Sequence, residues 1–181
     1  AHIPENRQEQ GLVLDFTVAE NVVLDSYYQP KYSRRSAMDW RAVRDRAEEL
    51  MEEFDVRASG VDAPVSTLSG GNQQKLIVAR EVGRDVALTI AAQPTRGVDV
   101  GSIEHIRRRL VAERDAGSAM VLVSSELDEI MALSDRILVM FRGRVVAERT
   151  PETTSTTELG LLMAGVEGSA AEQQSTNGPV S

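Results

Sequence analysis

Residues 68–75 read LSGGNQQK, and residues 73–82 have the pattern of a helix that ends near Gly83. Glycine lets a backbone approach a ligand closely, and the exposed N–H groups at the start of a helix favour an anion such as phosphate. A bare Ser-Gly-Gly is more often only a turn, with Ser69 as the helix N-cap. Both interpretations predict a helix that begins close to Ser69.

The segments on either side of this motif predict an α/β fold. From Ser36 to Phe54, apolar residues recur at every third or fourth position, which is typical of a helix with one face in a core. Short apolar runs at 86–91 and 119–123 indicate buried strands. The other expected elements are a helix from about Ile103 to Val111, a short helix at 126–133, a hairpin of 137–141 with 145–147, and a last helix at 158–164. Strands that alternate with helices indicate a sheet that is at least partly parallel.

The length of the chain favours one domain, since domains usually have roughly 100 to 200 residues and this chain has 181, of which 41% are hydrophobic. We expect the domain to occupy residues 1–166. Within it, residues 18–85 are predicted to be mainly helical, and residues 86–150 to supply core strands and helices. Residues 167–181 are polar and small and lack periodicity, so we expect a disordered tail.

The composition excludes several classes of function. Twenty Lys and Arg against 28 Asp and Glu give a net charge of −8, which argues against a nucleic-acid partner. The absence of cysteine excludes disulfides, Cys-ligated zinc and a thiol nucleophile. His2 and His105 share no ligand spacing, so no metal site is predicted. No apolar run is long enough for a membrane span, so any role at a membrane must come through a partner.

Taken over all eight residues, the LSGGNQQK motif resembles the signature motif of ATP-binding cassette (ABC) ATPases, in the Gln-rich form typical of sugar and nucleoside importers. Further segments resemble family motifs in the family order: the loop at 94–101, the switch region at 121–130 and the hairpin turn at 142–144, with 4–7 and 17–21 upstream. The resemblance covers about residues 1–165. It implies a P-loop NTPase-like cassette with a helical subdomain and a partly parallel core sheet.

The phosphate-binding loop of this family is missing from the sequence. No G-x-x-x-x-G-K-[ST] motif is present, and neither Lys31 nor Lys75 follows a glycine. The resemblance places that loop before Ala1, so we expect the chain to be the C-terminal portion of a cassette that has lost its first strand, loop and helix. Apolar faces and sheet edges would then be uncovered, with marginal stability or self-association as the result. Alone, the chain is expected not to hydrolyse ATP.

Four catalytic positions also depart from the family pattern. The family has an Asp-Glu pair that holds the magnesium shell and polarises water, whereas this chain has Ala92 and Gln93. A methyl group cannot ligate Mg²⁺, and a neutral amide cannot act as a general base. Ser125 stands where the family commonly has His, and Glu5 where it has Gln. The resemblance therefore implies a degenerate hydrolytic site with no intact catalytic residue and no metal ligand.

The intact residues imply a role in a neighbouring active site. In the family, two cassettes pair head to tail, and each ATP lies between the phosphate loop of one and the signature of the other. By resemblance, Ser69, Gly70, Gly71, Asn72 and Gln73 contact ATP with Mg²⁺ held mainly by a partner cassette, in tandem or as a dimer. Asp99 is expected to cross that interface and couple the sites.

The resemblance also implies partners and a location. The partners are membrane permease subunits and, indirectly, an extracytoplasmic solute-binding protein, with no nucleic acid. The location is cytoplasmic, on the inner face of the membrane through the permease. Two alternatives stay open: a catalytically silent module for dimerisation and permease docking, and a soluble ABC ATPase with no transport role.

Overall fold

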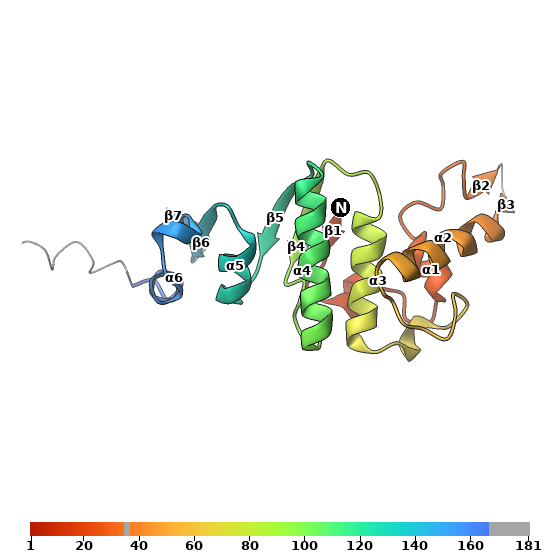
Figure 1. Ribbon diagram of the computed structural model, residues 1–181, viewed down its shortest axis with the longest axis horizontal. Helices are drawn as coiled ribbons and strands as arrows, with labels where there is room; N and C mark the ends of the chain where they lie inside the picture. Colours follow the sequence, from red (N-terminus) through yellow and green to blue (C-terminus); the bar gives the residue numbers. More distant parts are fainter. Residues whose placement is uncertain (35–36, 167–181) are drawn as a thin grey trace, which may run out of the picture. The chain divides into compact units, whose positions relative to one another are not determined.

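The computed structural model describes residues 1–34 and 37–166. The length of the chain favours one domain, but the structure forms two compact units. The first is Ala1–Val123, and the second begins at Ser124. Each unit is described by itself, and Figure 1 shows the order of their elements. Ser36, from which a helix was expected, and the tail at 167–181 lie outside the described residues.

A parallel sheet forms the centre of the first unit. Strand β4 (Leu88–Ala92) lies between β1 (His2–Ile3) and β5 (Ala119–Val123). Ile90 is the register partner of His2 on one side and of Val121 on the other. The strand predicted at 119–123 is confirmed, and the one predicted at 86–91 is present as β4. β1 is too short to have been predicted from a pattern of alternation.

Three long helices of the first unit begin at polar N-caps, whose side chains accept a hydrogen bond from a backbone N–H of the first turn. These helices are α2 (Trp40–Glu53), α3 (Gly70–Val82) and α4 (Val100–Asp115), and their caps are Asp39, Ser69 and Asp99. The short elements are η1 (Arg7–Gly11), α1 (Val18–Val22), β2 (Ser33–Arg34), β3 (Ala37–Met38) and η2 (Val65–Thr67). Residues 18–85, predicted to be mainly helical, contain α1, α2, η2 and α3 together with the two short strands β2 and β3.

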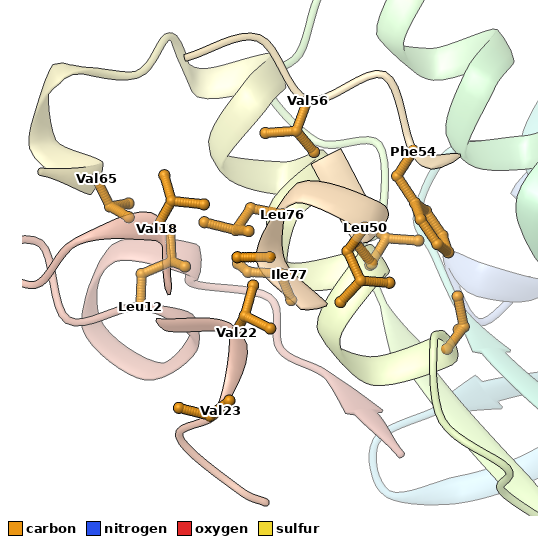
Figure 2. Packing of buried hydrophobic residues seen from close by; sticks show 14 of the residues in the cluster. Leu12, Val18, Val22, Val23, Leu50, Phe54, Val56, Val65, Leu76 and Ile77 are labelled. Carbon is orange, nitrogen blue, oxygen red and sulfur yellow. The ribbon is translucent and has the colours of Figure 1, made fainter. Parts of the chain in front are cut away.

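Helix α3 is the centre of the hydrophobic core. Every residue of α3 from Gln73 to Val82 is buried. Figure 2 shows Leu76 and Ile77 of this helix among side chains of α1 and α2, with Val22 and Leu50 nearby. The first turn of α3, which carries the LSGGNQQK motif, is therefore part of the best-packed element of the unit.

One face of the parallel sheet is only half covered. Alternate side chains of a strand point to opposite faces, and in β4 the buried residues are Thr89 and Ala91. The other row is exposed by about two-fifths to a half: Leu88 43%, Ile90 39%, Val121 48% and Val123 52%. β4 is thus buried on one face only, and the same face of β5 is partly buried by Met120 and Leu122, because the core of the described residues lies on that face. This row also confirms the expectation of uncovered apolar surface.

The second unit is a hairpin with two helices. Its elements are α5 (Leu127–Leu133), β6 (Ile137–Phe141), β7 (Arg144–Arg149), η3 (Pro151–Thr153) and α6 (Thr156–Met163). The strands are antiparallel, as predicted, and the turn residues Arg142 and Gly143 both have positive φ. Ile137 and Val139 pack with Leu159 and Leu162. In the part of the chain that is described, none of the helices is both long and apolar enough to cross a membrane.

Replacement of Ile77 by Ala tests the central place of α3. Ile77 is fully buried, so Ile77→Ala is expected to lower the free energy of unfolding by about 2–5 kcal/mol through a cavity. The matched control is Ile90→Ala, which changes a side chain that is 39% exposed and is expected to cost roughly 1 kcal/mol. Urea unfolding followed by circular dichroism measures both. Equal losses at the two positions would contradict the half-covered sheet face.

Candidate functional site

Ser69 is the N-cap of α3, which begins at Gly70, whereas the helical pattern of the sequence predicts a helix over 73–82. Its side-chain oxygen accepts hydrogen bonds from the Asn72 backbone N–H at 3.4 Å and from the Asn72 side-chain amide at 3.0 Å. The Ser69 side chain is nevertheless exposed. An exposed hydroxyl at the N-terminus of a 13-residue helix provides both a donor and the positive end of a helix dipole, which is suitable chemistry for a phosphate.

Gly70 and Gly71 are required by close packing in the first turn of α3. A Cβ atom on Gly71 would lie 2.5 Å from Oδ2 of Asp99 and 2.6 Å from Oγ of Ser102. A Cβ atom on Gly70 would lie 2.8 Å from Nη2 of Arg7. The glycines therefore let the start of α3 lie against the start of α4 and against Arg7, in addition to any role toward a ligand.

Asp99 is the N-cap of α4 and lies beside residues 69–73 at the start of α3, the signature turn. Its carboxylate accepts hydrogen bonds from the Ser102 backbone N–H at 3.0 Å and the Ser102 hydroxyl at 2.8 Å. These bonds hold the pKa of Asp99 below its ordinary value of 3.8. The structure thus brings Asp99 and Gly71 together within one chain, with Asp99 ionised at neutral pH.

The side chains of Asn72 and Gln73 are engaged inside the chain. Oδ1 of Asn72 accepts the Arg57 backbone N–H at 2.8 Å. The Gln73 amide donates to the Val65 carbonyl at 3.1 Å and accepts from the Gln8 amide at 3.4 Å. Gln73 is only 4% exposed. Of the five signature residues singled out in the sequence, Ser69 is the one whose side chain is exposed.

Lys75 is a buried cation behind the signature turn, and no sequence pattern indicates its partner. Its ammonium donates to the Asp55 carboxylate at 2.8 Å and to the Asp55 carbonyl. Lys75 is 5% exposed, whereas the Asp55 side chain is half exposed. The hydrogen bond from Lys75 lowers the pKa of Asp55 below its ordinary value of 3.8. The pair joins the end of α2 to α3.

Ala92 and Gln93 lie at the carboxyl end of β4, the edge at which parallel α/β sheets bind ligands. Gln93 has a left-handed backbone with φ of 49°, and its N–H donates to the Val123 carbonyl at 2.7 Å. Neither residue supplies a carboxylate. Among residues 1–34 and 37–166, no group of three or more His, Asp or Glu side chains is arranged to hold a metal ion.

The remaining two predicted positions are exposed. Glu5 follows β1 and forms an ion pair with Arg96, in the loop after β4. Ser125 lies at the start of the second unit, beside Ser124, whose hydroxyl accepts the Glu126 backbone N–H at 3.0 Å. In the first unit, Glu5 thus pairs with the loop that leads to Asp99, and Asp99 lies beside Gly71 in the turn that follows Ser69.

Arg7 is the residue at this site that sequence reasoning missed. Its guanidinium contacts the loop after β4 and lies against Gly70. The sequence contains one indirect indication of this contact. Gly70 is the first residue of α3, and a glycine there leaves space for the side chain of another segment.

Curated import proteins are similar to most of this chain. The nucleoside import ATP-binding protein NupA of Lactococcus lactis subsp. cremoris is 52% identical over 164 residues. The guanosine import ATP-binding protein NupO of Bacillus subtilis is 51% identical over 164 residues, and the ribose import ATP-binding protein RbsA 2 of Rubrobacter xylanophilus is 36% identical over 170. The alignments cover 91%, 91% and 94% of this chain and 32% of each relative. The chain therefore spans about a third of the length of these relatives. No protein-family model matches it.

A solved structure identifies the fold. The ATP-binding cassette MJ0796, in a dimeric post-hydrolysis state bound to ADP and Pi, superposes with a TM-score of 0.68 and 24% identity over 83% of this chain and 62% of that one. A second dimeric structure of the same cassette agrees equally well. The ABC-cassette fold, with its helical subdomain and partly parallel core sheet, is confirmed.

Removal of the Asp55 charge tests the pair with Lys75. Asp55→Asn is expected to lower the free energy of unfolding at pH 7 by about 1–2 kcal/mol, because a buried cation loses its ionic partner. The pKa of Asp55 is lowered in the folded chain, so this contribution is complete above the unfolded pKa and disappears as pH falls through the folded value. Chemical unfolding at pH 7, 5 and 3.5 measures the difference between variant and wild type.

The matched control is Asp62→Asn, which breaks an exposed pair with Arg44 and is expected to cost between 0 and about 1 kcal/mol. Asn tolerates the positive φ of position 55, so backbone strain does not obscure the comparison. An Asp55→Asn loss that stayed constant from pH 7 to pH 3.5 would contradict the ion pair.

Proposed function

We propose that this chain, which has the ABC-cassette fold and is homologous over 91% of its length to nucleoside import ATP-binding proteins, is part of an ATP-binding protein that drives the uptake of nucleosides or simple sugars. The observation that carries the proposal is the identity of 52% and 51% with two proteins named for nucleoside and guanosine import. Identity with the ribose import protein is lower, at 36%. A nucleoside is therefore the preferred solute.

Ser69 and the backbone of the turn at Gly70 and Gly71 are proposed to bind the phosphates of an ATP held by a second cassette. The exposed Ser69 hydroxyl and the helix N-terminus support this assignment. ATP with Mg²⁺ supplies the phosphoanhydride bond whose hydrolysis drives transport. Asn72 and Gln73 hold the shape of the turn, and Asp99 stands beside Gly71, where it is proposed to couple the signature to the partner cassette.

The site that includes Ala92 and Gln93 is proposed to be hydrolytically weak. A methyl group cannot ligate Mg²⁺, and an amide cannot take a proton from water. The two composite sites of the assembled protein would then differ: one has the signature of this chain and the carboxylates of its partner, and the other has Ala92 and Gln93.

The proposed assembly reaches the membrane through other proteins. We place the chain in the cytoplasm, against permease subunits that a solute-binding protein serves from outside. A non-transport ABC ATPase is the weaker alternative, because the relatives compared above are named for import.

The substitution Ser69→Arg tests the signature in the protein expressed from its complete gene. The large cation removes the hydroxyl and blocks the turn, so MgATP hydrolysis is expected to fall to below about 1% of wild type. The matched control is Ser66→Arg, at an exposed serine of η2, which is expected to keep wild-type turnover. Unchanged hydrolysis in Ser69→Arg would favour a catalytically silent module.

A separate measurement identifies the solute: the uptake of labelled guanosine and of labelled ribose by cells that express the protein.

The substitution Gln93→Asn tests whether the second site hydrolyses ATP. The shorter amide keeps the polarity and tolerates the left-handed backbone of this position, but it withdraws the group that would orient a water. We expect steady-state hydrolysis by the complete protein to change by less than about twofold. A tenfold fall would show that the site with Gln93 contributes most of the hydrolysis, or that the other site depends on it, and would contradict a hydrolytically weak site.

A further inference from the structure

Arg7 joins three segments that are distant in the sequence. Its Nη1 donates to the Arg96 carbonyl at 2.9 Å, and its Nη2 donates to the Gly97 carbonyl at 3.3 Å. The same Nη2 lies 2.8 Å from where a Cβ on Gly70 would be. One guanidinium therefore links η1, the loop that leads to Asp99, and the first turn of α3.

The fork of the guanidinium matches two consecutive carbonyls. Arg presents several N–H donors in a fixed plane, whereas Lys has a single ammonium at the end of a flexible stem. Gly97 has φ of 66°, a conformation that turns the loop at the point where Arg7 captures it. The ion pair between Arg96 and Glu5 ties the same two segments a second time. The loop that carries Asp99 is thus fixed from the side of η1.

The position of Arg7 is unfavourable for α3 by itself. The N-terminus of a helix has positive potential, and a cation there is destabilising. The compensation comes from the carbonyls of Arg96 and Gly97 and from the nearby Asp99 carboxylate, which lies 2.5 Å from the position of a Cβ on Gly71. The first turn of α3 thus has a cation at Gly70 and a carboxylate at Gly71.

We propose that Arg7 is a positioning residue, which sets the signature turn of α3 against the loop of Asp99 by capturing the Arg96 and Gly97 carbonyls beside Gly70. Its role in catalysis rests on the proposed function, whereas its role in holding the loop does not. Arg7 contacts both segments. The signature turn, which is proposed to bind a phosphate, and Asp99, which is proposed to contact the partner cassette, are therefore expected to move together.

Hydrogen exchange in the isolated chain tests the first part of the proposal. Arg7→Lys keeps the charge and loses the fork, and Arg7→Gln loses both. Each variant is expected to raise amide exchange roughly fivefold or more in peptides covering 94–102 and 69–74, with no change in α2 at 41–53. The control Arg108→Gln removes an exposed arginine of α4 that pairs with Glu104 and is expected to leave all three peptides unchanged.

The outcome separates positioning from general stability. A rise in all peptides, including α2, would make Arg7 a residue that only stabilises the fold, and no rise would remove the proposed link; either result overturns the proposal. If Arg7→Lys has the same amide protection as the wild type and Arg7→Gln does not, the effect arises from the charge of residue 7. This result would also overturn the proposal, because the two hydrogen bonds of the guanidinium would not be needed.

Turnover in the protein from the complete gene tests the second part. Arg7→Lys is expected to lower kcat for MgATP by roughly tenfold with little change in KM, because the turn is present but misplaced. Unchanged kcat together with local loosening would reduce Arg7 to a structural tie and overturn its positioning role. If the wild-type protein itself hydrolyses no ATP, the proposed function fails, and the exchange experiment still decides whether Arg7 holds the loop.

Discussion

A helix buried on all sides determines the structure of the first unit, because the charged side chains buried on α3 need partners inside the protein. Lys75 finds the Asp55 carboxylate, and Arg80 finds Glu81 and the Gly11 carbonyl. Removing one member of such a pair leaves the other polar group buried without a hydrogen bond or an ion pair. The exposed turn at Ser69 is therefore the free end of a firmly held element, which suits the role in ligand binding that is proposed for Ser69.

The charges around that turn are balanced over a short distance. Arg7 lies against Gly70, and the ionised Asp99 lies against Gly71. A bare helix N-terminus attracts any anion, whereas a carboxylate next to it repels one. Arg7 offsets this repulsion, and the hydrogen bonds from Ser102 hold Asp99 to its own helix. Close packing of glycines is what brings both charges near enough to matter.

The sequence predicts local features of this fold well and distant pairs poorly. The N-cap role of Ser69 follows from local cap chemistry, and β5 follows from a short apolar run. The link between Lys75 and Asp55 spans 20 positions, and the bond from Arg7 to Arg96 spans 89. Neither pair leaves a periodic pattern, because packing of separate elements brings its members together.

The left-handed backbone of Gln93 affects which substitutions could turn Ala92 and Gln93, the neutral pair at the end of β4, into an acidic pair. Gln and Glu have the same side-chain shape up to the terminal atom, so the φ of 49° at this position does not favour one over the other. Gln and Glu codons differ by one base, and the Ala codons GCU and GCC differ by one base from Asp codons. From either of these Ala codons, two single-base changes would give an acidic pair, and the backbone at position 93 is one that Glu can adopt as readily as Gln.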